Sequence, residues 1–274
     1  MPSIQEVAVT IIKTGAVEVR DVDAGDAPFV YSTGNRGPGY VMVKGLVGQP
    51  VAFKYLTRAL AEKVLSIGAK IDFVEGNATG GMVPGWQLRN DLSDLAKHEY
   101  PYCYLRGARK EGGHGELITG DRANPFIQKG MNVLIVEELV NFAGTTSNAA
   151  EEFRCAGYQV THAACILSYD HPESNAKLKE HKVSLIPLIT LPELLDAGLA
   201  AGLLPKASVD SYKEFLVDPT GWQLKRGYVV PEASAQKAQQ QGIAMKKLSA
   251  EEAIALGAPQ DKVKAGVVYW KKET

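Results

Sequence analysis

Two adjacent carboxylates, Glu137 and Glu138, stand between an apolar run and a turn of small residues. The apolar run, residues 131–137, has the continuous pattern of a buried parallel strand. The turn after it opens a segment that we expect to be helical, and it consists of Ala143, Gly144, Thr145, Thr146 and Ser147. A helix start offers unpaired N–H groups and a partial positive charge, which together suit a phosphate.

The carboxylates beside this turn could accept hydrogen bonds from sugar hydroxyls. They could also help to hold Mg²⁺, which prefers oxygen ligands. Residues 133–150 therefore indicate a site that grips a sugar phosphate at both ends. A plain helix start after a buried strand, with Glu138 solvated, explains the same pattern.

Glycines cluster in three other places, each between segments with regular apolar spacing. The clusters are Gly34, Gly37 and Gly39; Gly76, Gly80 and Gly81; and Gly112, Gly113 and Gly115. Glycine is favoured where the backbone turns sharply or approaches a ligand closely, so the clusters are either binding loops or plain turns. The third lies in a charged stretch, residues 107–130, that is long enough to predict a functional loop.

Strand and helix patterns alternate around these loops. We expect short strands within residues 6–20 and 29–47, and helices at 50–67, 84–97, 145–156, 172–181 and 192–201. Further strands are expected at 70–75, 102–106, 131–137, 160–168 and 183–190. This alternation predicts an α/β domain with a parallel sheet, in which ligands collect beyond the carboxyl ends of the strands.

Composition excludes several classes of protein. Thirty Lys and Arg stand against 31 Asp and Glu, so the overall basic charge of a nucleic-acid-binding protein is absent. No apolar run approaches the roughly 18 residues that a membrane span needs, and the first residues do not resemble a signal peptide. Three widely spaced cysteines predict reduced thiols in a cytoplasmic protein rather than a zinc site. The common dehydrogenase, P-loop, serine hydrolase and zincin motifs are missing.

Residues 133–147 resemble the fingerprint of the type I phosphoribosyltransferase family, in which an apolar strand, two acids and a small Gly-Thr turn follow one another. Five further segments occur in the order typical of the orotate phosphoribosyltransferases of that family, before and after the fingerprint. They are residues 29–50, residues 71–85 with a glycine loop, residues 104–117 with a basic loop, residues 165–174 with a strand end, and residues 185–195 with a final strand and the start of a helix.

The resemblance implies a central, mostly parallel sheet flanked by helices, with an N-terminal strand-rich hood and a C-terminal appendage. The phosphoribosyltransferase domain would span residues 1–205, with a flexible loop at about 107–118, and residues 206–274 would form the appendage. The implied reaction transfers the ribose 5-phosphate group of phosphoribosyl pyrophosphate (PRPP) to orotate, giving orotidine 5′-monophosphate and pyrophosphate. It uses Mg²⁺ and takes place in a cytoplasmic homodimer, without nucleic acid or membrane as a partner.

The resemblance also assigns roles to individual residues. The PRPP-binding set comprises Glu137, Glu138, Ala143, Gly144, Thr145, Thr146, Ser147, Gly80 and Gly81, with both glutamates near the magnesium through PRPP and water. The catalytic set on the basic loop comprises Arg106, Arg109, Lys110 and His114. The base would contact Thr79, Thr145 and His171.

Several positions depart from the family pattern. Both acids are Glu, where the family usually has Asp at one or both positions; Ser32 stands in place of a Lys, and His171 stands in place of an Arg. The glycine loop also lacks the family's Lys. These departures leave open a phosphoribosyltransferase for another nucleobase, or a non-catalytic regulator that binds PRPP or a nucleotide. Two further residues are not assigned to the site. We interpret Arg36 as a solvated charge, with an anion contact as the alternative, and Trp86 as a core residue.

Overall fold

The computed structural model describes residues 1–107, 116–122 and 124–273. Its contacts divide the chain into two units, each described by itself below. The first contains Met1–Ala16 and Met42–Ala201, and the second contains Val17–Val41 and Gly202–Thr274. The sequence expectation placed residues 17–41 with the amino-terminal domain, whereas the structure groups them with the C-terminal residues.

A six-stranded sheet forms the centre of the first unit, with the order β10-β9-β8-β5-β6-β7. All neighbouring strands are parallel except β7, which runs antiparallel to β6. The strands are β5 (Phe73–Asn77), β6 (Tyr102–Leu105), β7 (Ile118–Thr119), β8 (Asn132–Val140), β9 (Gln159–Ser168) and β10 (Ser184–Thr190). The predicted α/β class with a mostly parallel sheet is confirmed.

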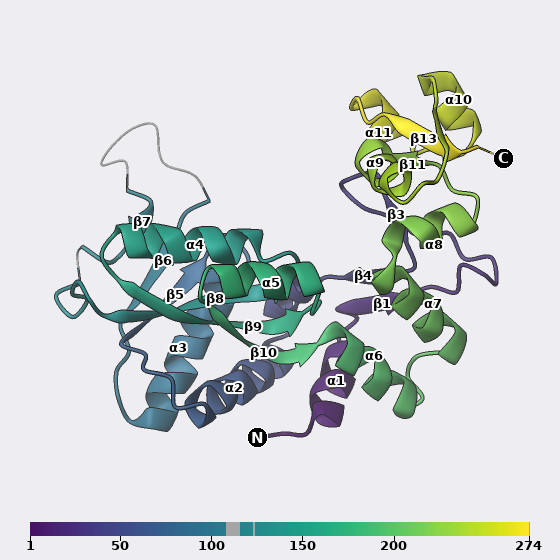
Figure 1. Cartoon of the computed structure of the whole chain (residues 1–274). Helices are drawn as coiled ribbons and strands as arrows, with labels where there is room; N and C mark the ends of the chain where they lie inside the picture. Colours follow the sequence, from purple (N-terminus) through teal and green to yellow (C-terminus); the bar gives the residue numbers. More distant parts are fainter. Residues whose placement is uncertain (108–115, 123, 274) are drawn as a thin grey trace. The chain divides into compact units, whose positions relative to one another are not determined.

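Helices cover both faces of this sheet, with α2 and α3 on one face and α4 and α5 on the other (Figure 1). The helices are α2 (Pro50–Ser66), α3 (Met82–Ala96), α4 (Gly144–Cys155), α5 (Pro172–Glu180) and α6 (Leu191–Ala200), and a 3₁₀ helix, η1 (Val43–Gly48), precedes α2. All five predicted helices are therefore present. The central strand β8 is buried on both faces along residues 133–137, which explains its unbroken apolar run.

The amino terminus differs from the prediction of two short strands in residues 6–20. Ile4–Lys13 forms a helix, α1, that packs against α6, and only Val17–Val19 forms a strand, β1. Ser3 and Glu6 form a capping box at the helix start. Val7, Ala8 and Ile11 are buried along one helical face. The β-branched composition suggested a strand, but the cap and the helical spacing determine the structure.

The second unit combines four short strands with a set of C-terminal helices and a three-stranded antiparallel sheet of order β11-β13-β12. The short strands are β1, β2 (Phe29–Val30), β3 (Arg36–Gly37) and β4 (Gly39–Val41). The later elements are α7 (Lys206–Val217), α8 (Pro219–Lys225), β11 (Val230–Pro231), α9 (Glu232–Gln240), β12 (Met245–Lys247), α10 (Ala250–Ala255), α11 (Gln260–Lys264) and β13 (Tyr269–Lys272).

Hydrogen bonds from the C-terminal elements hold the turn between β2 and β3. The hydroxyl of Tyr269 donates to the carbonyl of Gly34 at 3.0 Å. The amide side chain of Gln223 accepts from the backbone N–H of Arg36 at 2.8 Å and donates to the side-chain oxygen of Asn35 at 3.1 Å. Ser234 donates to the same oxygen at 2.8 Å. These bonds explain why residues 17–41 belong with the second unit.

The interpretation of Arg36 as a solvated charge is wrong. Its side chain is buried, with 7% of the residue exposed. The guanidinium donates to the carbonyl of Gly257, just beyond the end of α10, and lies 5.0 Å from the ring centre of Tyr228. A cation at the carboxyl end of a helix is favourable, so Arg36 has a structural partner here.

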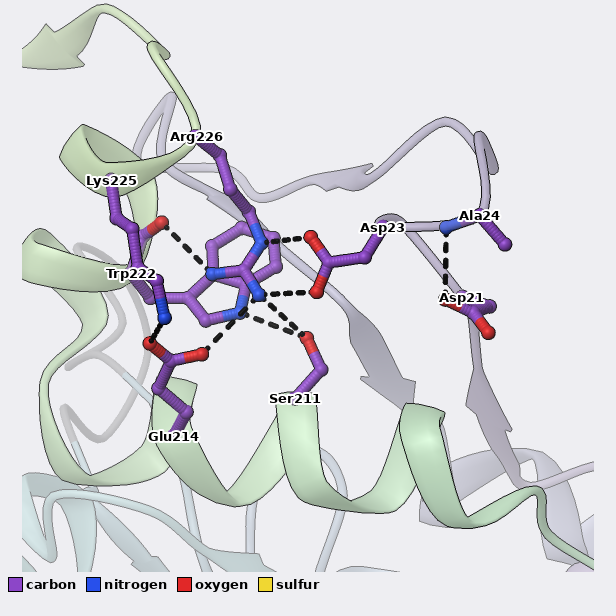
Figure 2. Close-up of polar contacts among 8 residues, drawn as sticks. All are labelled: Asp21, Asp23, Ala24, Ser211, Glu214, Trp222, Lys225 and Arg226. Atoms are coloured by element: carbon purple, nitrogen blue, oxygen red, sulfur yellow. Dashed lines mark hydrogen bonds and ion pairs between the residues drawn. The ribbon is translucent and has the colours of Figure 1, made fainter.

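A second anchor lies around Arg226 (Figure 2). Its guanidinium donates to both carboxylate oxygens of Asp23, at 2.9 and 2.6 Å, and to Glu214 at 3.2 Å. It also lies 4.2 Å from the ring centre of Trp222, which is fully buried. Asp23 precedes β2, whereas Glu214 lies in α7, Trp222 in α8 and Arg226 directly after α8, so this cluster joins the two chain segments of the unit.

We expect Arg226→Met to lower the free energy of unfolding by about 1–3 kcal/mol, because it leaves Asp23 and Glu214 without their shared cation. Lys225→Met is the matched control, since Lys225 makes an exposed ion pair with the same Glu214 and should contribute about 0–1 kcal/mol. Urea denaturation followed by tryptophan fluorescence measures both values. Equal losses for the two variants would contradict the anchoring role of Arg226.

Candidate active site

Strand β8 extends further than the sequence predicted, from Asn132 to Val140, so Glu137 and Glu138 lie inside it. Successive side chains of a strand point to opposite faces. The two carboxylates therefore take different surroundings, Glu137 being buried and Glu138 half-buried.

The carboxylate of Glu137 collects three hydrogen bonds on one oxygen. Its Oε1 accepts from the side-chain amide of Asn77 at 2.7 Å, from the hydroxyl of Thr145 at 2.9 Å and from that of Thr146 at 3.2 Å. The donors come from the end of β5 and the first turn of α4. Glu137 thus fixes this turn against the sheet, and the two threonine hydroxyls are engaged here by a carboxylate.

Burial raises the pKa of Glu137 to about 7, although the three hydrogen bonds favour the ionised form and oppose this shift. A second carboxyl, Glu75, lies two residues before Asn77 on β5 and is completely buried. Burial, and secondarily the charge of Glu137, raise the pKa of Glu75 well above its ordinary value. One oxygen of Glu75 accepts from the N–H of Leu105, and the other has no partner among the described residues.

Asn77 and Glu75 are absent from the residues singled out in the sequence. Glu75 is the last residue of the run predicted as a short strand, and Asn77 follows two residues later, at the start of the glycine loop. A charged residue inside an apolar strand was the available signal for Glu75, and a polar residue at a strand end was the signal for Asn77. Neither signal names Glu137 as the partner, since that contact is made across 60 residues of chain.

Glu138 instead faces the glycine loop that follows β5. A Cβ atom on Gly80 would lie 1.9 Å from both carboxylate oxygens of Glu138, which is impossible without displacement. A Cβ on Gly81 would lie 2.1 Å from the carbonyl oxygen of Val136. The close approach of the loop to the backbone of β8 therefore requires glycine at position 81, while Gly80 leaves room for the carboxylate of Glu138. Glu138 has no hydrogen-bond or ion-pair partner among the residues that the structure describes.

The turn before α4 has the geometry expected of an anion site. Ala143 adopts a left-handed conformation, with φ of 54°, and its carbonyl accepts the N–H of Ser147 at 3.0 Å. Helix geometry leaves the N–H groups of Gly144, Thr145 and Thr146 without partners within the helix. Among the described residues the buried hydroxyl of Ser147 also lacks a partner. These N–H and O–H groups can donate hydrogen bonds to a phosphate that lies directly beside the carboxylates.

The remaining predicted residues lie at the carboxyl ends of neighbouring strands. Thr79 is exposed on the glycine loop after β5, and Arg106 follows β6. Parallel strands end at the same edge of a sheet, so these two residues, the turn before α4 and the residues after β9 share one edge. Arg109, Lys110 and His114 lie outside the described residues.

His171 follows β9 and is the residue before the first turn of α5. Its ring stacks on Phe142 at a centroid distance of 5.1 Å and on Tyr169 at 5.6 Å. Phe142 belongs to the turn after β8 and is 57% exposed. The structure thus brings His171 next to the turn between β8 and α4, and Phe142 is a further residue beside this turn that the sequence analysis did not select.

Three other observations bear on earlier expectations. Trp86 is 51% exposed and packs edge-on against Tyr102, so its assignment to the core is wrong. The described part of the chain contains no group of three or more His, Cys, Asp or Glu side chains placed to hold a metal ion. It also contains no helix that is long and apolar enough to cross a membrane.

Comparison with known proteins places this site in a family. The model of the phosphoribosyl transferase domain matches residues 44–193, which lie entirely within the first unit. The orotate phosphoribosyltransferase of Listeria monocytogenes serovar 1/2a is 30% identical over 195 residues, covering 71% of this chain and 88% of that protein.

Solved structures agree with this relationship. Orotate phosphoribosyltransferase from Aeropyrum pernix is 25% identical with a TM-score of 0.54, covering 69% of this chain and 97% of that one. The UMP synthase of Leishmania donovani shares the fold, with a TM-score of 0.62 at 20% identity, covering 79% of this chain and 42% of that one. The chain belongs to the phosphoribosyltransferase family, and its relatives in sequence include orotate phosphoribosyltransferases.

Proposed function

We propose that the protein transfers the ribose 5-phosphate group of PRPP to orotate, releasing pyrophosphate and forming orotidine 5′-monophosphate in pyrimidine biosynthesis. The names of its relatives support orotate as the acceptor. The observation that carries the proposal is the arrangement of Glu137, Glu138 and the amino terminus of α4 beside Gly80. It offers donors for a phosphate and a carboxylate for ribose hydroxyls at one edge of the sheet.

In this proposal the free N–H groups at the start of α4 bind the 5′-phosphate. Glu138 accepts hydrogen bonds from the ribose hydroxyls, and the loop with Gly80 and Gly81 approaches the pyrophosphate. The transition state resembles an oxocarbenium ion, with negative charge growing on the departing pyrophosphate. Arg106 and the neighbouring catalytic set, Arg109, Lys110 and His114, supply the positive charge that stabilises this group.

Magnesium fits this site as a partner of the substrate. Mg²⁺ commonly keeps several waters and binds through one or two carboxylates together with substrate phosphates. Glu138 is a carboxylate of this kind, since no described residue pairs with it. A bound magnesium ion would neutralise charge on the pyrophosphate. The proposal retains the cytoplasmic homodimer that the family resemblance implies.

The base would lie near Thr79, Thr145 and His171. Stacking between Phe142 and Tyr169 holds the imidazole of His171 in one orientation. An imidazole offers a single donor toward a carboxylate where an Arg offers two parallel ones. Orotate binding would therefore depend more on ring stacking and on protonation of His171 than it does at a site with Arg.

The activity is tested by measuring pyrophosphate release from PRPP and Mg²⁺ with a panel of nucleobases. We expect release with orotate, and His171→Ala should raise the KM for orotate more than the KM for PRPP. Turnover with an uncharged base alone would support the acceptor alternative. Binding of PRPP without turnover of any base would support a regulator.

We expect Glu138→Gln to weaken PRPP binding at least about tenfold in the presence of Mg²⁺, because it removes the charge that faces the ribose and the metal. Gly80→Ala should weaken binding as well, since the added Cβ displaces the carboxylate of Glu138. Isothermal titration calorimetry measures both affinities. Gly48→Ala is the matched control because a Cβ there meets no atom within 4 Å. Unchanged affinity in folded Glu138→Gln would refute the contact.

The raised pKa of Glu137 predicts a pH dependence of stability. The folded protein keeps this proton up to a pH of about 7, whereas the unfolded chain loses it near the ordinary value of 4.5. Stability therefore falls as pH rises between these two values. Glu137→Gln cannot titrate, so its free energy of unfolding should fall less across this window, by roughly 2–3 kcal/mol. Urea denaturation between about pH 5 and pH 7.5 tests this, and parallel curves for both proteins would contradict it.

A further inference from the structure

A lysine from the neighbouring helix lies beside the turn that opens α4. Helix α5 packs against α4, and Lys177 stands in its last turn. A Cβ atom on Gly144 would lie 3.8 Å from Nζ of Lys177, and apart from the chain neighbours of Gly144 and the backbone of α4 itself no other described atom lies within 4 Å of that position. The ammonium of Lys177 therefore borders an open space next to the first residue of α4.

No described residue pairs with this ammonium. The side chain of Lys177 is exposed, and its ammonium forms no hydrogen bond or ion pair with any residue among 1–107, 116–122 and 124–273. The buried carboxylate of Glu137, which contacts the first turn of α4, is already held by Asn77, Thr145 and Thr146. The positive charge of Lys177 thus adds to the partial positive charge of the helix start, and no described acid neutralises it.

This placement is electrostatically unfavourable for an empty turn. The amino terminus of a helix carries a partial positive charge, so a cation beside it is repelled. The first turn of α4 also holds the hydroxyl of Ser147, which is 2% exposed and has no partner in the described chain. Unpaired N–H groups, an unpaired buried hydroxyl and an unpaired ammonium together favour a ligand with more than one negative charge.

We propose that Lys177 binds the terminal phosphate of the ribose 5-phosphate moiety, as a point charge that completes the turn at residues 143–147. The proposal rests on the proposed function, because it takes this turn as the 5′-phosphate site. It adds a residue from α5 to a site otherwise built from β8 and α4. Lys177 neutralises the second negative charge of the phosphate, while the helix N–H groups bind its oxygens.

A different role for Lys177 is to stabilise the carboxyl end of α5. Lys177 and Lys179 both lie in the last turn of that helix, where cations are favourable. Lys179 lies in the same last turn of α5 and is also exposed, but its side chain does not lie within 4 Å of the position that a Cβ atom on Gly144 would take. Lys179→Gln is therefore a matched control for Lys177→Gln, since both remove a charge from the same helix end.

The test compares binding of ribose 5-phosphate and of inorganic pyrophosphate to the full chain and to both variants by calorimetry. We expect Lys177→Gln to weaken ribose 5-phosphate binding about tenfold at low salt. The difference from the unmodified chain should shrink at about 0.5 M salt, because an exposed charge is screened. Pyrophosphate binding should stay unchanged, and Lys179→Gln should bind both probes as the unmodified chain does.

The outcomes separate this inference from the function on which it rests. If the unmodified chain binds ribose 5-phosphate and Lys177→Gln binds it equally well, the role of Lys177 is overturned while the proposed function stands. Equal weakening by Lys179→Gln also overturns it, since the effect then belongs to helix α5 as a whole. If the unmodified chain binds neither ribose 5-phosphate nor PRPP, both proposals fail. Thermal unfolding of each variant confirms that the compared proteins are equally folded.

Discussion

The buried carboxylate of Glu137 is the interaction on which the candidate site depends. One of its oxygens joins Asn77 at the end of β5 to Thr145 and Thr146 at the start of α4. Taking a carboxylate out of water is costly, and the three donors offset part of that cost, since the pKa of Glu137 is still raised to about 7. The end of β5, which is 60 residues away in the chain, is thereby joined to β8 and to the start of α4, and the free N–H groups of α4 face the same edge as Glu138.

Because side chains alternate between the two faces of a β-strand, the two adjacent acids have different roles. Because Glu137 points into the polar cluster, Glu138 must point to the other face, where Gly80 and Gly81 leave room for it. Glu137 is thus the structural acid of the pair, and Glu138 is the acid that faces the glycine loop. A Glu at each position reaches one methylene further than an Asp would, which suits the contact of Glu137 with Asn77 and the approach of Glu138 to the glycine loop.

The sequence predicted those features that depend on local patterns. Apolar runs and helical spacing located the sheet, the five flanking helices and the turn at residues 143–147. It failed where distant contacts decide the outcome. Arg36 carries a charge and was expected to be solvated, yet it is buried in the second unit, where it forms hydrogen bonds with Gln223 and Gly257. Likewise, the strand containing Glu137 continues past two charged residues because β9 pairs with it as far as Val140.

The three glycines near residue 37 show the same limit. Their spacing is typical of a ligand loop, but a Cβ on Gly39 would lie 2.1 Å from the ring of Tyr212, and a Cβ on Gly34 would lie 2.6 Å from the hydroxyl of Tyr269. Gly34 and Gly39 thus leave room for aromatic side chains of the C-terminal elements, and Gly37 leaves room for Tyr31, just as Gly80 leaves room for a carboxylate. Whether a glycine loop receives a ligand or another part of the protein is decided by residues far away in the chain.

The C-terminal residues are consequently part of the fold of residues 17–41. The turn at residues 34–36 has its backbone and side-chain groups satisfied by Tyr269, Gln223 and Ser234. Without these partners the backbone N–H of Arg36 would lose its acceptor, and the carbonyl of Gly34 and the side-chain oxygen of Asn35 would lose their donors. Such unpaired polar groups are unfavourable in a protein interior. The family match ends at residue 193. The segment beyond it therefore supplies the structural support of an early segment of the chain, which explains why the second unit is assembled from both ends of the sequence.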